Sequence, residues 1–89
     1  MLIALIARDK AGALQTRLDN RSAHLAYIEE TGVVAQAGPL LDGDAMIGSL
    51  IVLDVDDLAA AQLWADNDPY AKAGLFDSVE LIAWKKVVG

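Results

Sequence analysis

The sequence predicts an α+β sandwich of the ferredoxin-like type, with the element order β-α-β-β-α-β in a single domain over residues 1–89. Two stretches that are apolar on both faces, Leu2–Ala7 and Met46–Leu53, are each followed by a helical pattern. The turn Asp42–Gly43–Asp44 has the composition of a hairpin and joins the two middle strands. Because crossover connections are right-handed, both helices are expected on one face of the sheet.

The first strand and first helix follow from the start of the chain. The apolar run is short and is stopped by the charged pair Arg8–Asp9, which favours a strand over a buried helix. The pattern is helical from about Ala13 to Thr31, and Gly32 can adopt the left-handed conformation that ends a helix. The inward stripe of this helix, at spacings of three and four, is predicted to be Leu14, Leu18, Arg21, Leu25 and Ile28.

The middle of the chain supplies the hairpin. Val33–Ala37 is predicted as the second strand, and Gly38–Pro39 interrupts it. A proline cannot donate to a strand ladder, so this is an edge strand or the end of one.

The second crossover completes the sandwich. Asp56 or Asp57 is expected to cap a helix over Leu58–Asp66, which stops at Asn67–Asp68–Pro69 because the residue before a proline is disfavoured in helices. One further turn is expected over Pro69–Ala73, closed by Gly74, and a last strand over Phe76–Val87.

The composition narrows the function classes. Thirteen acids against seven bases give a net charge of −6, which argues against nucleic-acid binding. No cysteine is present, so disulfides, thiolate metal sites and a cysteine nucleophile are excluded. No apolar run is long enough to cross a membrane or to act as a signal sequence. We therefore expect a cytoplasmic protein without membrane partners.

The apolar content predicts self-association. Apolar residues make up 55% of the chain, and the first and third strands lack the alternation of a sheet with one wet face. The face opposite the helices would be a larger apolar patch than monomers usually expose. A homodimer that packs sheet against sheet, or a higher even oligomer, is the predicted assembly.

The single histidine marks the candidate site. Arg17, Arg21 and His24 are spaced by four and three along one edge of the first helix. The topology places Asp68 near the N-terminal half of that helix, where a His24–Asp68 pair could act as a general acid or base. Asp68 is also a good cap for the turn that begins at Pro69, and both roles could hold.

The other polar groups have two interpretations each. Arg17 and Arg21 could hold a ligand anion, or pair with acids on a solvated edge, which is the better interpretation for Arg17. Gly38–Pro39 and Gly48–Ser49 could let a ligand approach the backbone, or mark a bulge or strand end. Trp64 and Tyr70 could wall a pocket, although Trp64 suits the core. Capping explains Asp54, Asp56 and Asp57 better than a metal site does, and neither a metal nor another cofactor is expected.

Several segments together resemble the YciI-like (YCII-related) family. They are the apolar first strand, "RSAHLAYI", "GVVAQAGPL", "GSLIVLDVDDLAAAQLWADNDPYAKAG" and "VELIAWKK". The resemblance implies a dimeric α+β barrel with a cleft near the dimer interface, built on His24 and Asp68. Arg21 precedes the histidine, and Gly38, Pro39 and Ser49 would line the cleft. A similar protein dehydrochlorinates a hydroxylated chloroaromatic.

The sequence therefore supports three hypotheses. The first is a small lyase- or isomerase-type enzyme that acts on a small, aromatic or anionic molecule. His24 would transfer the proton, and Asp68 would orient the His24 imidazole. Arg21 would hold an oxygen anion, and Tyr70 and Ser49 would contact the substrate. The second is a non-catalytic ligand-binding or accessory dimer, and the third is a structural interaction module without a pocket.

Overall fold

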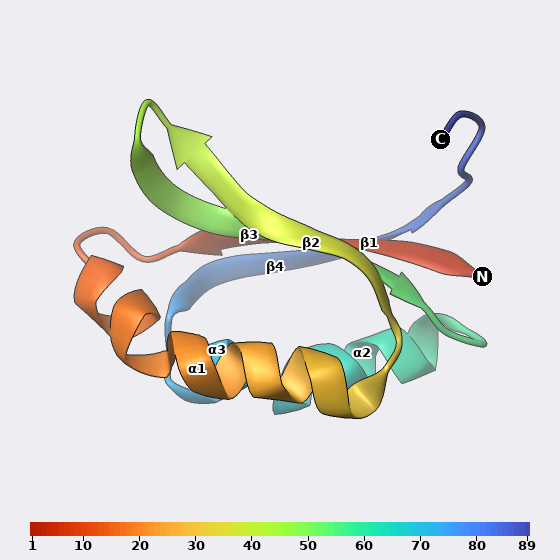
Figure 1. Cartoon of the computed structure of the whole chain (residues 1–89), viewed down its shortest axis with the longest axis horizontal. Coiled ribbons are helices and arrows are strands. Elements are labelled where there is room, and N and C mark those ends of the chain that lie inside the picture. The colour runs from red at the N-terminus through yellow and green to blue at the C-terminus, as the bar shows by residue number, and fades with distance from the viewer.

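Four strands form one antiparallel sheet, and all helices lie on one of its faces (Figure 1). The structure, a computed structural model, describes all residues from 1 to 89. The elements in order are β1 Leu2–Asp9, α1 Leu14–Thr31, β2 Val34–Asp42, β3 Ala45–Asp54, α2 Leu58–Asn67, α3 Pro69–Lys72 and β4 Phe76–Trp84. The strand order is β2-β3-β1-β4, which confirms the predicted ferredoxin-like sandwich.

Two strand limits differ from the prediction. β2 does not stop at Gly38–Pro39 but continues to Asp42, paired with β3 throughout. It is an edge strand, as predicted, and an edge position tolerates the missing N–H of Pro39. β4 ends at Trp84, so the predicted extension to Val87 is wrong. Residues 85–89 have no strand partner, and in Figure 1 they leave the sheet on the side away from the helices.

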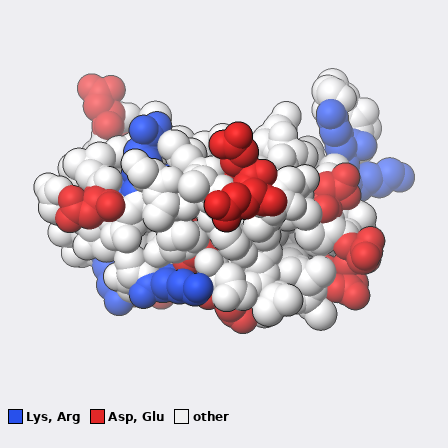
Figure 2. Space-filling model, turned by 60° about the horizontal axis from the view of Figure 1, so that its bottom comes forward, with Lys and Arg blue, Asp and Glu red and all other residues white.

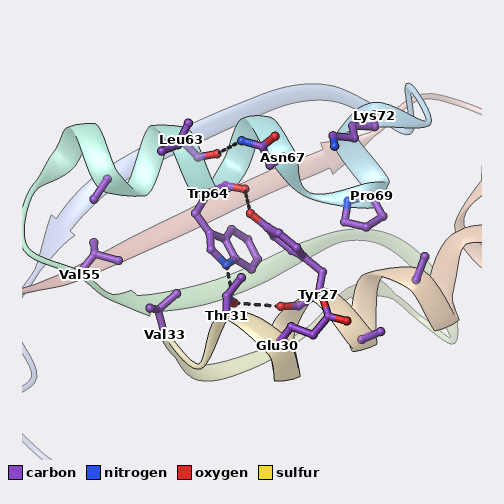
Figure 3. A pocket seen from close by; sticks show the side chains of 13 residues that line it. Tyr27, Glu30, Thr31, Val33, Val55, Leu63, Trp64, Asn67, Pro69 and Lys72 are labelled. Carbon is purple, nitrogen blue, oxygen red and sulfur yellow. Dashed lines mark hydrogen bonds between the residues drawn. The ribbon is translucent and has the colours of Figure 1, made fainter.

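The apolar core lies between the sheet and α2. Its buried members are Ile3, Leu5, Ala7, Ile51, Leu53, Ala61, Trp64 and Ala65. The Trp64 indole Nε1 donates to Thr31 Oγ1 at 2.9 Å, and the Tyr27 hydroxyl donates to the Trp64 carbonyl oxygen at 2.8 Å. These bonds fasten the C-terminal half of α1 to α2 (Figure 3). The predicted core role of Trp64 is confirmed.

The first helix buries a different face from the one predicted. Its fully buried residues are Arg17 and His24, whereas Leu14, Leu18 and Leu25 remain about half exposed. Arg21 is exposed as well, and only Ile28 of the predicted stripe packs against the core. The prediction was wrong because it assumed that the apolar face of a helix points inward. Here the inward face is polar, since it lines a cleft.

The outer face of the sheet is apolar. In the strand register Ile6 stands opposite Leu50, and Ala4 stands opposite Val52 and Ile82. These residues alternate with the core residues Ile3, Leu5 and Ala7, so they point away from the helices. Leu50, Ile82 and Trp84 are each more than 40% exposed. The outer face is therefore largely apolar, as expected from the sequence, although Glu80 stands opposite Ile6.

Candidate functional site

His24 and Asp68 meet across the two crossover segments. The Nδ1 atom of His24 lies 2.7 Å from Oδ1 of Asp68, and both side chains are almost fully buried. Asp68 stands between α2 and α3 in an extended conformation, and its Oδ1 also accepts from the Tyr70 backbone N–H at 3.0 Å. Helix capping and contact with the histidine therefore use the same oxygen. The other oxygen, Oδ2, is buried and has no hydrogen-bond partner.

Tyr70 is held between a histidine and an arginine. The imidazole of His24 stacks on the Tyr70 ring, with 3.9 Å between centroids and 14° between planes. The Arg17 guanidinium lies over the same ring at 4.8 Å. Because the imidazole already covers one face, we place the guanidinium on the other. Residues 17 and 24 are two helical turns apart, which leaves room for one ring between them.

Arg17 is a buried cation with a dedicated counter-ion. Its Nε donates to Asp9 Oδ2 at 2.7 Å, and its Nη2 donates to Asp9 Oδ1 at 2.9 Å and to Ser49 Oγ at 2.8 Å. Burial acts to lower the pKa of the guanidinium, but the hydrogen bonds and charge of Asp9 outweigh it and raise this pKa above its ordinary value. The interpretation of Arg17 as part of a solvated edge was therefore wrong.

The pKa of the Tyr70 phenol is raised as well. Burial is the main cause, and it prevails over the Arg17 and Arg21 charges, which act in the opposite direction. The Asp68 carboxylate adds to the increase. Tyr70 is therefore a neutral hydroxyl at physiological pH.

These side chains line a cleft of about 190 Å³ between α1 and the β2–β3 half of the sheet. Seven residues that the sequence singled out border it, namely Arg17, Arg21, His24, Gly38, Pro39, Ser49 and Tyr70. Asp68 does not reach the cleft surface and stands behind His24. Nε2 of His24 has no protein partner but is not sealed from solvent, so it is free toward the cleft.

The two glycines singled out in the strands have different roles. A Cβ added at Gly38 would meet nothing within 4 Å, in keeping with open space beside the cleft. A Cβ added at Gly48 would lie 2.2 Å from the carbonyl oxygen of Ala7. The register of β3 against β2 also shifts at this point. Gly48 thus lets two strands approach each other beside a bulge.

Sequence reasoning missed Asp9 and undervalued Arg17. One signal was available, since residues seven apart on a helix share a face and Arg17 is seven before His24. The second was the position of Asp9 at the end of the central strand, next to the start of α1. Neither residue looks unusual alone, because a charged pair at a strand end usually marks a solvated connection.

A larger hollow of about 790 Å³ lies elsewhere, on the outer side of the helix layer between α1 and α2 (Figure 3). It is a wide surface groove bordered by Tyr27, Leu63 and Trp64. Its prominent polar atoms, the Trp64 Nε1 and the Tyr27 hydroxyl, bond within the protein. We therefore place the candidate site at the smaller cleft, where polar groups converge.

The charged side chains outside the cleft do not meet the requirements of a metal site. On the face seen in Figure 2, acidic side chains lie in several groups, and basic side chains lie beside some of them. No three His, Asp or Glu residues come together as a potential metal site. Asp57 caps α2, with Oδ1 accepting from the Ala60 N–H at 2.8 Å, which settles the choice between Asp56 and Asp57. None of the helices has the length and apolarity to span a bilayer.

Comparison with known proteins identifies the family of the chain. The YCII-related domain model matches residues 1–85. Protein YciI of Escherichia coli is 38% identical over 97 aligned positions, which cover 98% of this chain and 99% of the relative. An uncharacterized Haemophilus influenzae protein is 30% identical over the same shares.

Among solved structures, 5-chloro-2-hydroxyhydroquinone dehydrochlorinase (TftG) of Burkholderia phenoliruptrix AC1100, in complex with 2,5-dihydroxybenzoquinone, superposes with a TM-score of 0.86. It is 34% identical, and the match covers 96% of this chain and 94% of that one. An antibiotic biosynthesis monooxygenase at 12% identity and a TM-score of 0.58 shares the fold alone. The chain belongs to the YCII-related domain family.

Proposed function

We propose that this protein is a small enzyme that uses His24 for proton transfer on a hydroxylated ring compound. The observation that carries the proposal is the buried 2.7 Å contact between His24 Nδ1 and Asp68, with Nε2 left free toward a cleft. A carboxylate on Nδ1 fixes the tautomer in which Nε2 can accept a proton, and it stabilises the imidazolium that forms. Asp68 orients the histidine and does not itself contact the substrate.

The proposed reaction is elimination or isomerisation. His24 Nε2 removes the proton of a ring hydroxyl, and the electron pair of that O–H bond shifts into the ring. In an elimination the imidazolium first returns the proton to the ring carbon that carries the leaving group, which makes this carbon tetrahedral. His24 Nε2 then removes a second hydroxyl proton, and the electron pair of that O–H bond forms a C=O bond while the ring double bond shifts and an anion such as chloride departs with its bonding electrons. In an isomerisation the imidazolium returns the proton to a different ring atom. TftG, a dehydrochlorinase, supports the first of these for a related chain.

The dimensions and polarity of the cleft support a substrate of one ring. A space of about 190 Å³ suits a molecule of one ring. Arg21 at the mouth is exposed, bonds to no acid, and is proposed to attract an anionic substrate. Gly38 and Pro39 form the wall on the β2 side, while Ser49 and Tyr70 face the ring from β3 and α3.

We also propose that two copies pack sheet against sheet. The outer face that contains Ile6, Leu50 and Ile82 is largely apolar, and its central residue Val52 is already buried by its neighbours. A second copy would remove this surface from water and close a barrel-like core.

A substrate screen tests the proposal. Purified protein is incubated with chlorinated hydroquinones, other hydroxylated aromatics and lactones, and chloride release and ultraviolet spectra are recorded. We expect turnover that falls at least about 100-fold in His24→Ala. A variant that turns over any discovered substrate at the unchanged rate would remove His24 from the mechanism. Tight binding without consumption across the whole set would favour a non-catalytic binding protein.

A further inference from the structure

We infer that the cleft contains an oxyanion-binding subsite made by Arg17 Nη1 and the Ser49 hydroxyl, and that Asp9 holds the Arg17 side chain, to which Ser49 is hydrogen-bonded, in place. This inference rests on the proposed function and names the part of the site that receives negative charge. It assigns the inner anion contact to Arg17, which is buried, and leaves exposed Arg21 to attract the substrate at the mouth.

The first step is the hydrogen-bond capacity of Arg17. A guanidinium has five N–H donors. Asp9 takes Nε and one N–H of Nη2, and Ser49 takes the other. Nη1 bonds to no protein atom, yet it is not among the buried polar atoms that lack a partner, so it retains contact with solvent. The only hollow that Arg17 borders is the His24 cleft. Nη1 therefore has donor capacity left for a ligand at that cleft, beside the Tyr70 phenol with which the guanidinium also interacts.

The second step is the direction of the Ser49 hydroxyl. Ser49 Oγ accepts a hydrogen bond from Arg17, and this is its single bond within the protein. An oxygen that accepts from a cation has its own O–H polarised and free to donate elsewhere. Ser49 is buried, and the cleft is the only hollow that it borders. Its proton is thus available to a ligand beside Arg17 Nη1.

The third step is the position of these donors relative to His24. The guanidinium and the imidazole both contact the Tyr70 ring, and the residues that carry them lie two helical turns apart on α1. One aromatic ring with a hydrogen bond at each end spans a separation of about 10 Å. A one-ring substrate can therefore give a proton to His24 Nε2 while an oxygen at its far end, where charge accumulates, meets Arg17 and Ser49.

The subsite predicts a ligand class that can be tested without knowing the natural substrate. The anion of 2,5-dihydroxybenzoquinone is a one-ring probe with oxygens at both ends, and its binding can be followed by absorbance titration of the whole protein. The test variant is Ser49→Ala, which leaves the Asp9–Arg17 pair intact. The matched control is Ser22→Ala, a serine exposed on α1 away from the cleft. A second variant, Arg17→Lys, keeps the charge and removes the fork of donors.

We expect Ser49→Ala and folded Arg17→Lys each to weaken probe binding about 10- to 100-fold, with Ser22→Ala unchanged. Circular dichroism of every variant identifies loss of fold. Absence of probe binding by the native protein at millimolar concentration, or equal affinity in Ser49→Ala and native protein, would overturn the inference. The two proposals fail separately. If probe binding depends on Ser49 but no screened compound is turned over, the subsite is supported and the enzyme proposal fails. If turnover depends on His24 but is unchanged in Ser49→Ala, the enzyme proposal is supported and the subsite fails.

Discussion

Asp9 accepts two parallel hydrogen bonds from Arg17, 2.7 and 2.9 Å long, and both side chains are more than 90% buried. A charge buried in a protein is costly unless its partner stays in place. This pair spans the junction between the central strand β1 and the first turn of α1. It therefore connects stability of the sandwich to the geometry of the cleft.

Replacing Arg17 with methionine should destabilise the fold strongly. The Asp9 carboxylate would remain buried without its cation, and breaking a buried pair from one side costs about 3–5 kcal/mol. Urea denaturation followed by circular dichroism measures the free energy of unfolding. The double variant Asp9→Leu with Arg17→Met removes both charges, so it should recover much of the loss. A double variant as unstable as the single one would show that packing, not charge, is responsible.

Replacing Asp68 with asparagine should separate catalysis from capping. The amide oxygen can still accept from the Tyr70 N–H, so α3 keeps its cap and the thermal midpoint should change little. The imidazolium would lose its carboxylate, and kcat on any substrate found should fall about 100-fold or more. Asp57→Asn, at the cap of α2 away from the cleft, is the control. Native kcat in Asp68→Asn would contradict the assigned role of Asp68.

The sequence predicted the fold because strand brevity, the hairpin turn and the two crossovers each allow few alternatives. It predicted the His24–Asp68 contact because the topology brings the end of α2 to α1. It could not predict which face of α1 is buried. Leu14, Leu18 and Leu25 dominate the helical pattern, while the buried row at Arg17 and His24 is polar. Hydrophobic periodicity identifies a core, and it is misleading where a helix lines a site.

Gly48→Ala should weaken the centre of the sheet. The added methyl would lie 2.2 Å from the Ala7 carbonyl oxygen, a backbone atom that cannot move without breaking the β1–β3 ladder. We expect a loss of about 1–3 kcal/mol in unfolding free energy, as found for overpacked interiors. Gly38→Ala, which meets nothing within 4 Å, is the control on the neighbouring strand. Equal stability of the two variants would mean that the strands can separate at little cost.

Stability should decline in alkaline solution because two tyrosines, Tyr70 and the partly buried Tyr27, have raised phenol pKa values. Burial raises the pKa of Tyr70 and of Tyr27, and the Asp68 charge contributes to both. Above the ordinary phenol pKa of about 10 the unfolded chain loses these protons before the folded chain does. The stabilisation is therefore complete below pH ~10 and is lost as pH rises through the folded pKa values. The free energy of unfolding is measured between pH 8 and pH 11 in the native protein and in Tyr70→Phe. At about pH 10 and above, it should fall less steeply with pH in the variant than in the native protein. An unchanged slope in that variant would exclude Tyr70 as a cause.

Replacing Ile82 with aspartate should break the proposed dimer. Ile82 is 45% exposed in the single chain and stands beside Ala4 on the outer face of the sheet, where no helix covers it. If a second copy packs there, the variant must bury a charge without a partner, which costs several kcal/mol. Sedimentation at micromolar concentration should give the native protein twice the mass of one chain and the variant the mass of one chain.

Leu63→Asp is the matched control, because Leu63 is 66% exposed on α2, at the opposite side of the molecule. A native protein that sediments as one chain, with the outer face wet, would refute the sheet-to-sheet pairing. Equal dissociation by the control would move the interface to the helices.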